Sequence, residues 1–130
     1  AQNDKAEIRQ IEPYVFCQST HSRASRQYGV SRLPWLTGTT AWAYYAATHH
    51  ILGLQPEADG MRIDPCIPSA WKSFSMERRF RGKTLSIRVE NPNGVQKGVR
   101  RLTLNGKEMK GGFIPAKELK AKNDITVVMG

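Results

Sequence analysis

Apolar and polar residues alternate along the second half of the chain in four short runs, at 73–80, 84–90, 99–104 and 125–129. Alternation with a period of two is typical of strands that bury one face. The links between the runs contain residues that favour tight turns: Arg81-Gly82, Asn91-Pro92-Asn93-Gly94 and the hairpin signal Asn105-Gly106. Short strands joined in this way predict an antiparallel β-sandwich, a two-layer, jelly-roll-like domain over residues 55–130.

The first half of the chain contains a longer apolar run, LPWLTGTTAWAYYAATHHIL, at 33–52. Apolar residues lie on nearly every side of a helix drawn through its second half, and Gly53 is a natural stop for that helix. Such a helix is expected to be buried in a larger assembly, because alone it would expose Trp42 and Tyr45 among other aromatic side chains. We therefore interpret residues 1–54 as the last part of a bundle or barrel of helices, with a domain boundary near 54–60.

The residues Thr37, Gly38, Thr39 and Thr40 stand at the start of this helix. The first turn of a helix leaves backbone N–H groups without partners, and two interpretations follow. In the first, a threonine hydroxyl caps the helix by accepting a hydrogen bond from one of these groups. In the second, the helix start binds an anion such as phosphate. The spacing by itself favours capping.

The residues before the apolar run are mostly polar. A weak helix or a loop is expected at 2–10, a short buried run at 14–17 that ends at Gln18, and a long polar and basic loop at 19–31. Loops of that length in compact domains are often functional. His21 lies in this loop but is interpreted as an ordinary exposed histidine, and His49 and His50, near the end of the predicted helix, as structural.

The net charge of +9 is concentrated from Pro56 onward, where fifteen lysines and arginines stand against eight acidic residues. These charges alternate with apolar residues along the predicted strands, which is typical of the solvated face of a sheet, and no nucleic-acid-binding motif accompanies them. We therefore expect no nucleic-acid partner. No stretch is long and apolar enough to span a membrane, so no membrane partner is expected either. Cys17 and Cys66 match no metal-binding spacing and are predicted to be buried, reduced thiols of a cytoplasmic protein.

A series of short motifs gives the strongest functional signal. In chain order they are Glu12-Pro13-Tyr14, Gln18, LPWLTGT at 33–39 with Ala41-Trp42, ILGL at 51–54, Pro56-Glu57, Asp59-Gly60, RIDPCIP at 62–68, Trp71 and NPNGV at 91–95. In this order they resemble the C-terminal end of the glycoside phosphorylases of glycoside hydrolase family 94, which include cellobiose and chitobiose phosphorylases. The combination of WLTGT with DPCIP is highly specific. Thr40, where the family more often has alanine, is a mild departure.

This resemblance implies a fold and a site. Members of the family carry an (α/α)6 barrel followed by a C-terminal two-layer β-domain, so residues 1–54 would be the last part of the barrel. The family binds inorganic phosphate with the Thr-Gly pair of its TGT motif, which corresponds here to the Thr37 hydroxyl and the Gly38 backbone N–H. A glutamine after the EPY segment hydrogen-bonds the donor sugar, and Gln18 stands at that position. The alternative for Gln18 is an amide that satisfies loop backbone.

The implied reaction is inverting phosphorolysis, in which a β-linked disaccharide and phosphate give an α-sugar 1-phosphate and a free sugar. An inverting glycosidase needs an acid and a base that activates water; phosphate replaces that base and water, so one acid and a phosphate cradle suffice. The scheme uses inorganic phosphate as co-substrate and needs no metal and no organic cofactor.

The catalytic acid of the family is an aspartate that lies well upstream in the barrel, and none of Asp4, Glu7 or Glu12 resembles it in context. The chain is therefore expected to be a C-terminal fragment of such an enzyme, inactive alone and completed by the upstream barrel of the same protein. Members of the family commonly form homodimers, which is an expectation for the parent protein as well.

Two alternatives stay open at this point. The same motifs occur in the C-terminal part of cyclic β-1,2-glucan synthases, which would make the parent a much longer protein with transmembrane segments upstream. The β-domain could also be a non-catalytic carbohydrate-binding or assembly module, with Trp71 as a contact for glycans.

Overall fold

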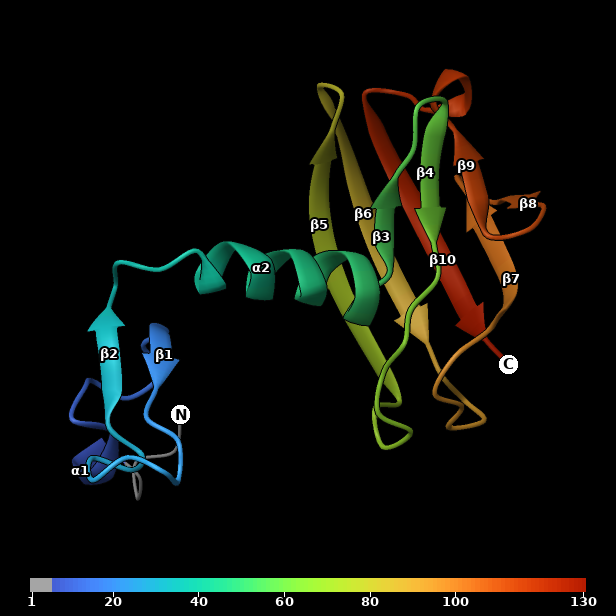
Figure 1. Cartoon of the computed structure of the whole chain (residues 1–130). Coiled ribbons are helices and arrows are strands. Elements are labelled where there is room, and N and C mark those ends of the chain that lie inside the picture. Colours follow the sequence, from blue (N-terminus) through green and yellow to red (C-terminus); the bar gives the residue numbers. More distant parts are fainter. Residues whose placement is uncertain (1–5) are drawn as a thin grey trace. The chain divides into compact units, whose positions relative to one another are not determined.

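The computed structural model describes residues 6–130, and the chain forms two compact units that divide between Tyr45 and Ala46 (Figure 1). The described residues are mostly sheet, with one helix longer than a single turn, α2 (Thr39–Tyr45), which the π-helix η2 (Ala46–Ile51) follows along the chain. The domain boundary expected after Leu54 stays a prediction. Within residues 6–130, no helix has both the length and the apolar composition needed to cross a membrane.

The C-terminal unit contains a five-stranded sheet with the order β5-β6-β10-β7-β8 and a three-stranded sheet with the order β3-β4-β9. The larger sheet is made of β5 (Ser73–Phe80), β6 (Lys83–Glu90), β7 (Val99–Leu104), β8 (Lys107–Met109) and β10 (Lys122–Met129). The smaller sheet is made of β3 (Leu54–Pro56), β4 (Gly60–Ile63) and β9 (Phe113–Pro115), after which comes the 3-10 helix η3 (Ala116–Glu118). Figure 1 shows the two sheets as two layers, so the predicted β-domain is confirmed.

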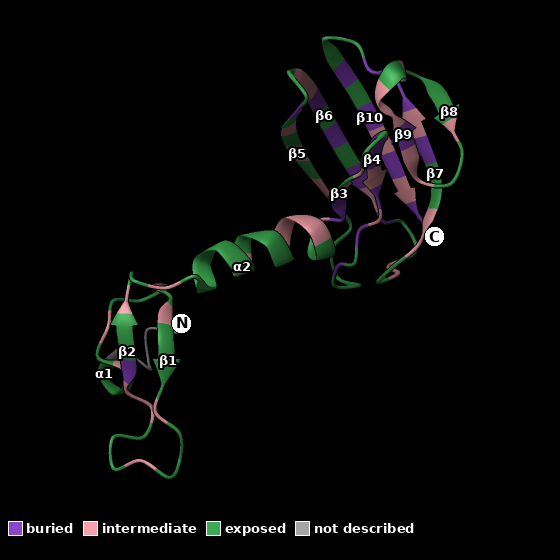
Figure 2. Cartoon of the chain, turned by 45° about the horizontal axis from the view of Figure 1, so that its top comes forward, coloured by how far each residue is buried: buried purple, intermediate pink, exposed green. Residues whose placement is uncertain are grey.

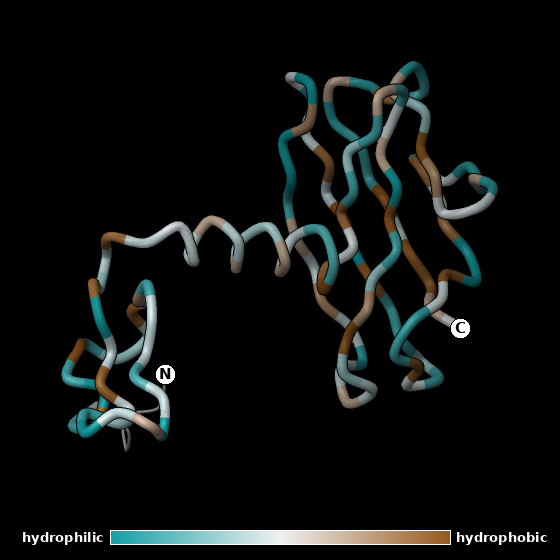
Figure 3. The backbone as a smooth tube through the Cα atoms, viewed as in Figure 1, coloured by the Kyte–Doolittle hydropathy of each residue, from teal (hydrophilic) through white to brown (hydrophobic). Residues whose placement is uncertain are grey.

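The alternating pattern of the strands places one face of each sheet in a shared core. Along β6, the side chains of Leu85, Ile87 and Val89 are at most 2% exposed, whereas Ser86 and Arg88 between them are exposed to solvent. The smaller sheet adds Met61 and Ile63, both fully buried. Burying each such side chain stabilises the fold by about 1.5–3 kcal/mol. The core appears as the purple bands in Figure 2, and Figure 3 shows hydrophobic and hydrophilic segments alternating along β6 and β10.

One strand pair corrects the prediction of a purely antiparallel sandwich. β10 pairs with β7 in the antiparallel sense but runs parallel to β6, with Ile125 beside Ile87 and Val127 beside Val89. Two-residue hairpins join antiparallel strands only, whereas parallel neighbours need a long connection. Here β7, β8 and β9 all lie between β6 and β10 along the chain, and local turn signals cannot reveal a pairing across that distance.

The predicted turns are confirmed by their backbone angles. Asn105 and Gly106 have φ of 50° and 82° and join β7 to β8, and Arg81 and Gly82 have φ of 50° and 74° and join β5 to β6. Positive φ at both positions is the signature of the type I′ turn that matches the twist of a hairpin.

Asn91 organises the loop that follows β6. It is fully buried, its Nδ2 donates to the carbonyl oxygens of Trp71 (3.1 Å) and Val95 (2.8 Å), and its Oδ1 accepts from the N–H of Val95 (2.9 Å). The side chain therefore satisfies three backbone groups around the NPNG loop and is itself fully hydrogen-bonded although it is buried.

The N-terminal unit is small and has little apolar interior. It contains α1 (Ala6–Arg9) and a hairpin of β1 (Cys17–Thr20) and β2 (Ser31–Pro34), in which Cys17 pairs with Pro34 and Thr20 with Ser31. The long loop predicted at 19–31 is thus shorter, because its two ends form this hairpin. The prediction of a buried run at 14–17 is wrong for the described chain: Tyr14 is 75% and Phe16 42% exposed.

The predicted helix in the 33–52 stretch is present as α2 and η2, and neither element contains a buried residue. Trp42 is 73% and Tyr44 60% exposed, so burial of this helix in a larger assembly stays a prediction. The predicted stop at Gly53 is confirmed: its φ is 76°, and a Cβ there would overlap the backbone of Asp64. Both cysteines are free, as expected, but neither is buried: Cys17 is intermediate in burial and Cys66 is exposed.

Candidate phosphate and sugar site

The Thr37–Gly38 turn begins α2 with a hydrogen-bonded arrangement of threonines. The Thr37 Oγ1 accepts from the backbone N–H of Thr39 (3.0 Å) and donates to the Thr39 Oγ1 (2.8 Å). The carbonyl oxygen of Gly38 accepts from the N–H of Trp42 (3.2 Å), which makes Gly38 the residue that leads into the helix. In this structure the Thr37 hydroxyl therefore caps the first turn, as the simpler interpretation of the sequence predicted.

Capping does not prevent the same hydroxyl from binding an anion. A hydroxyl has one donor and two acceptor positions, so Thr37 can keep the Thr39 N–H and turn its own proton from the Thr39 hydroxyl to a phosphate oxygen. The exposed position of Thr39 leaves its hydroxyl able to find water instead. Capping by the Thr37 hydroxyl and anion binding by the same hydroxyl are thus compatible interpretations.

Gly38 lies in open space. A Cβ built at this position has no atom within 4 Å, and the φ of Gly38 lies outside the left-handed region that favours glycine. Neither backbone conformation nor packing among the described residues therefore requires glycine here. A bound ligand that approaches the Gly38 backbone closely would require it, because a side chain would occupy the same space.

Gln18 lies on the neighbouring strand, exposed, in the middle of β1. Two hydrogen bonds hold the WLTGT segment against this strand: the N–H of Trp35 donates to the Phe16 carbonyl (3.3 Å), and the Thr39 Oγ1 to the Cys17 carbonyl (3.4 Å). Gln18 directly follows Cys17, so the structure brings the candidate sugar-binding residue and the Thr37–Gly38 turn into one small region. No hydrogen bond from Gln18 to loop backbone is found within residues 6–130.

The EPY motif lies in the same region. The Trp35 Nε1 donates to the Glu12 Oε1 (3.3 Å), and a cavity is lined by residues from both motifs: Pro13, Tyr14, Val15, Phe16, Trp35 and Thr40. Tyr14, Leu33 and Trp35 have φ of 65°, 48° and 66°. Left-handed backbone at non-glycine residues costs of order 1–3 kcal/mol each and is found most often at functional sites. The sequence contains no signal for this strain.

His21 has a structural role in the hairpin. Its N–H donates to the Val30 carbonyl (2.9 Å), its carbonyl accepts from the Gly29 N–H (3.1 Å), and its Nδ1 is hydrogen-bonded to the Ser25 Oγ (3.0 Å). These contacts close the loop between β1 and β2, and His21 is intermediate in burial rather than exposed as expected from the sequence.

Sequence reasoning missed a polar cluster under the hairpin. The Arg9 Nε donates to the Ser31 Oγ (3.3 Å), and the Arg9 Nη2 to the Val15 carbonyl (2.9 Å). The hydrogen bond with Ser31 lowers the pKa of the nearby Cys17 thiol; burial opposes this, and Thr20 and Arg9 add to the lowering. The cluster joins segments far apart in the sequence, so no local pattern could predict it.

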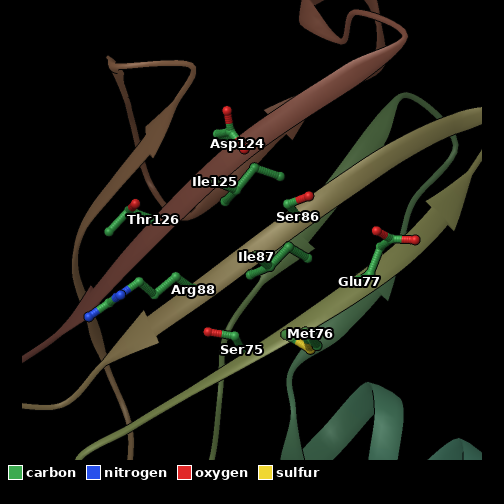
Figure 4. Close-up of a pocket in the computed structure, with 9 residues that line it drawn as sticks. All are labelled: Ser75, Met76, Glu77, Ser86, Ile87, Arg88, Asp124, Ile125 and Thr126. Carbon is green, nitrogen blue, oxygen red and sulfur yellow. The ribbon is translucent and has the colours of Figure 1, made fainter.

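Elsewhere the structure offers less for ligand chemistry. In the described part of the chain, no group of three or more histidine, cysteine or acidic side chains is placed to hold a metal ion. Figure 4 shows an open hollow on the outer face of β5, β6 and β10, lined by polar side chains such as Glu77, Ser86 and Arg88 above the buried Ile87 and Ile125. Its nine lining residues include no aromatic ring on which a sugar could stack. Trp71 is 45% exposed and packs edge-to-face on Phe74, 6.0 Å between centroids.

Two family models divide the chain between them. Residues 1–53 match the glycosyl hydrolase 94 superfamily, catalytic domain, and residues 54–108 match the glycosyl hydrolase family 65, C-terminal domain. The resemblance predicted from the motifs is confirmed: the chain is related to the C-terminal part of the family 94 glycoside phosphorylases.

Individual relatives are disaccharide phosphorylases. The chain is 46% identical over 129 residues, 99% of its length, to the N,N'-diacetylchitobiose phosphorylase of Vibrio proteolyticus, of which it covers 16%. It is 44% identical over 129 residues, again 99% of its length, to the N,N'-diacetylchitobiose phosphorylase of Vibrio furnissii, of which it covers 16%. It is 40% identical over 104 residues, 80% of its length, to the solabiose phosphorylase of Paenibacillus borealis, of which it covers 14%. The chain thus spans about a sixth of the length of these relatives.

Proposed function

We propose that this chain is the C-terminal part of an inverting glycoside phosphorylase and supplies part of its phosphate and donor-sugar site. The observation that carries the proposal is the relatedness to disaccharide phosphorylases over 99% of the chain. The arrangement of the Thr37–Gly38 turn beside the strand that holds Gln18 supports it further. In the parent protein, residues 1–54 would complete an (α/α)6 barrel, whose other helices cover the aromatic side chains of α2.

In the proposed reaction, phosphate attacks the anomeric carbon of the donor sugar while an acid protonates the leaving oxygen. The Thr37 hydroxyl and the Gly38 N–H would hold phosphate in line for this attack, and the Gln18 amide would hydrogen-bond the donor sugar. The acid would come from the upstream barrel. The scheme needs no metal or organic cofactor, and the parent protein would act in the cytoplasm, where phosphate is abundant.

The substrate proposed first is N,N'-diacetylchitobiose, because two of the most similar relatives carry that name. The test is to incubate the full-length parent protein with phosphate and a panel of β-linked disaccharides and to measure the release of sugar 1-phosphate. Release of an α-configured product from chitobiose would support the whole proposal. If no disaccharide is cleaved and glucan is instead made from a sugar nucleotide, the parent is a synthase and the proposal fails.

Two substitutions in an active parent test the site. Thr37→Val removes the hydroxyl and keeps the shape, and Gly38→Ala adds one methyl group to a space that is empty of protein atoms. Because no atom of the described residues lies within 4 Å of that methyl group, Gly38→Ala should leave thermal stability unchanged and raise the KM for phosphate. Gly82→Ala, in a β-hairpin far along the chain, also adds a methyl group in open space; its φ of 74° should cost it some thermal stability, but as the control it should leave the KM for phosphate unchanged. Unchanged phosphate kinetics in both site variants would show that the anion binds elsewhere.

A further inference from the structure

A single guanidinium group connects three segments of the N-terminal unit. Through Nε and Nη2, Arg9 of α1 reaches the Ser31 hydroxyl at the start of β2 (3.3 Å) and the Val15 carbonyl before β1 (2.9 Å). Both bonds use the planar fork of the guanidinium, in which the donor directions are rigid. The position of β1 is therefore coupled to the position of one side chain.

The place of Arg9 is unusual for a cation. Among residues 7–45 the buried side chain is Ser31, 7% exposed, and from Glu7 to the end of the chain the buried apolar residues all lie from Leu54 onward. The Arg9 Nη1 is itself buried and has no hydrogen-bond partner among the residues that the structure describes. Burying a cationic donor costs free energy unless it is fully hydrogen-bonded, so an apolar side chain would serve stability alone at least as well. A rigid, polar anchor at this place is expected if the position of β1 must be fixed more exactly than apolar packing would fix it.

The two anchors of Arg9 lie on either side of Gln18 along β1. Val15 precedes Gln18, and Ser31 pairs across the hairpin with Thr20, which follows it. The Cys17 thiol lies near the polar cluster of Arg9 and Ser31, and its Sγ is 3.6 Å from the Thr20 Oγ1. Gln18, between these two anchors, is exposed and therefore accessible to a ligand.

We propose that Arg9 is a positioning residue for the donor-sugar side of the site, which fixes β1 so that the Gln18 amide faces the ligand. This inference rests on the function proposed above and extends it to a residue that does not touch substrate. A lysine cannot replace Arg9, because one ammonium group on a flexible stem does not hold Ser31 and Val15 in a fixed fork.

The first test uses the 130-residue chain in a Cys66→Ser background, so that Cys17 is the remaining thiol. The rate of its alkylation by iodoacetamide is measured against pH, because the thiolate is the form that reacts. Arg9 helps to lower the pKa of Cys17, so Arg9→Gln should shift the rate profile to higher pH. Arg23→Gln, at an exposed position in the loop between β1 and β2, is the control. An unchanged profile both in Arg9→Gln and in Ser31→Ala, which removes the hydrogen bond that lowers the Cys17 pKa most, would overturn the inference, because the cluster would then not form in solution.

The second test is a double-mutant cycle in the parent enzyme. Arg9→Gln and Arg9→Lys should each lower kcat/KM for the disaccharide by up to about 100-fold, the scale expected when a binding group is misplaced by an ångström. If Arg9 acts through Gln18, the double variant Arg9→Gln/Gln18→Ala should be no worse than Gln18→Ala alone. Ser31→Ala, which removes one anchor and is less disruptive to folding, should show the same non-additivity, and melting curves identify any variant that is unfolded.

The outcomes separate the two proposals. Additive losses in an active parent would overturn the role of Arg9 and leave the proposed function standing. A wild-type parent that releases no sugar 1-phosphate would overturn the proposed function and the positioning role together. Loss of activity in Arg9→Gln that Arg9→Lys restores would show that charge alone matters, which also contradicts the inference.

Discussion

The two units of this chain are stabilised by different kinds of contact. In the C-terminal unit, alternating strands bury a continuous apolar core in which Leu85, Val89 and Val127 are fully inaccessible to solvent. In the N-terminal unit, polar contacts around Arg9 hold the segments together, while Trp35 and Trp42 are more than 70% exposed. The C-terminal unit has the interior of an independent domain. The N-terminal unit has the exposed aromatic surface expected of a part that other residues complete.

The largest expected effect comes from the apolar core. Leu85→Ala removes a fully buried side chain from β6 and should lower the free energy of unfolding by about 2–5 kcal/mol, because it leaves a cavity as well as losing apolar burial. Urea unfolding followed by circular dichroism measures this. Leu36→Ala in the N-terminal unit, where the side chain is 77% exposed, is the matched control and should change stability by less than about 0.5 kcal/mol. Equal losses in both variants would contradict the contrast between the units.

A smaller effect is expected at the polar centre of the β-domain. Asn91→Ala leaves the carbonyl oxygens of Trp71 and Val95 and the N–H of Val95 without their partner, at a fully buried position. An unsatisfied buried group costs about 1–3 kcal/mol, and the loop should also exchange its amide protons faster. The exposed Asn93, two positions along in the same loop, gives the control Asn93→Ala. If Asn93→Ala destabilises the domain as much, the buried hydrogen bonds of Asn91 are not what holds the loop.

The smallest effect on folding, but a clear one on association, is expected on α2. Trp42 packs edge-to-face on Tyr45, 6.3 Å between centroids, and the two rings line an exposed apolar hollow with Ala41. The chain alone should therefore self-associate, and Trp42→Ser should reduce association without loss of stability. Light scattering over a range of concentrations measures this. Trp71→Ser, which removes a half-exposed tryptophan from the β-domain, should not reduce association, and a wild-type chain that stays monomeric at high concentration would contradict the prediction.

Much of the β-domain could be predicted from the sequence because its signals are local. The strands β5 and β7 begin and end where the alternation does, and Asn105-Gly106 and Arg81-Gly82 form the expected turns. The short strands β3, β4, β8 and β9 were missed, since three or four residues are too few to show a period. β1 and β2 were missed for another reason: their residues are mostly polar, and only pairing with each other makes them strands.

The candidate site divides in the same way. Thr37, Gly38 and Gln18 were named from motifs, and the structure brings them into one region without testing their roles. The Arg9 cluster and the left-handed backbone at Tyr14, Leu33 and Trp35 had no counterpart in the sequence pattern. Each of these depends on which segments meet, and residues distant along the chain leave no periodic signal of their meeting.

The sequence by itself determined the strand faces, the hairpin turns, the end of the helix at Gly53 and the relation to family 94, because each of these is carried by neighbouring residues or by motifs read in order. The tertiary structure decided that β10 runs parallel to β6, that Thr37 caps its own helix while Gly38 faces open space, and that Arg9 hydrogen-bonds both Ser31 and Val15. These features depend on contacts between segments far apart in the chain. Local propensity does not distinguish the possible pairings of such segments, and packing and hydrogen-bond geometry decide which pairing forms.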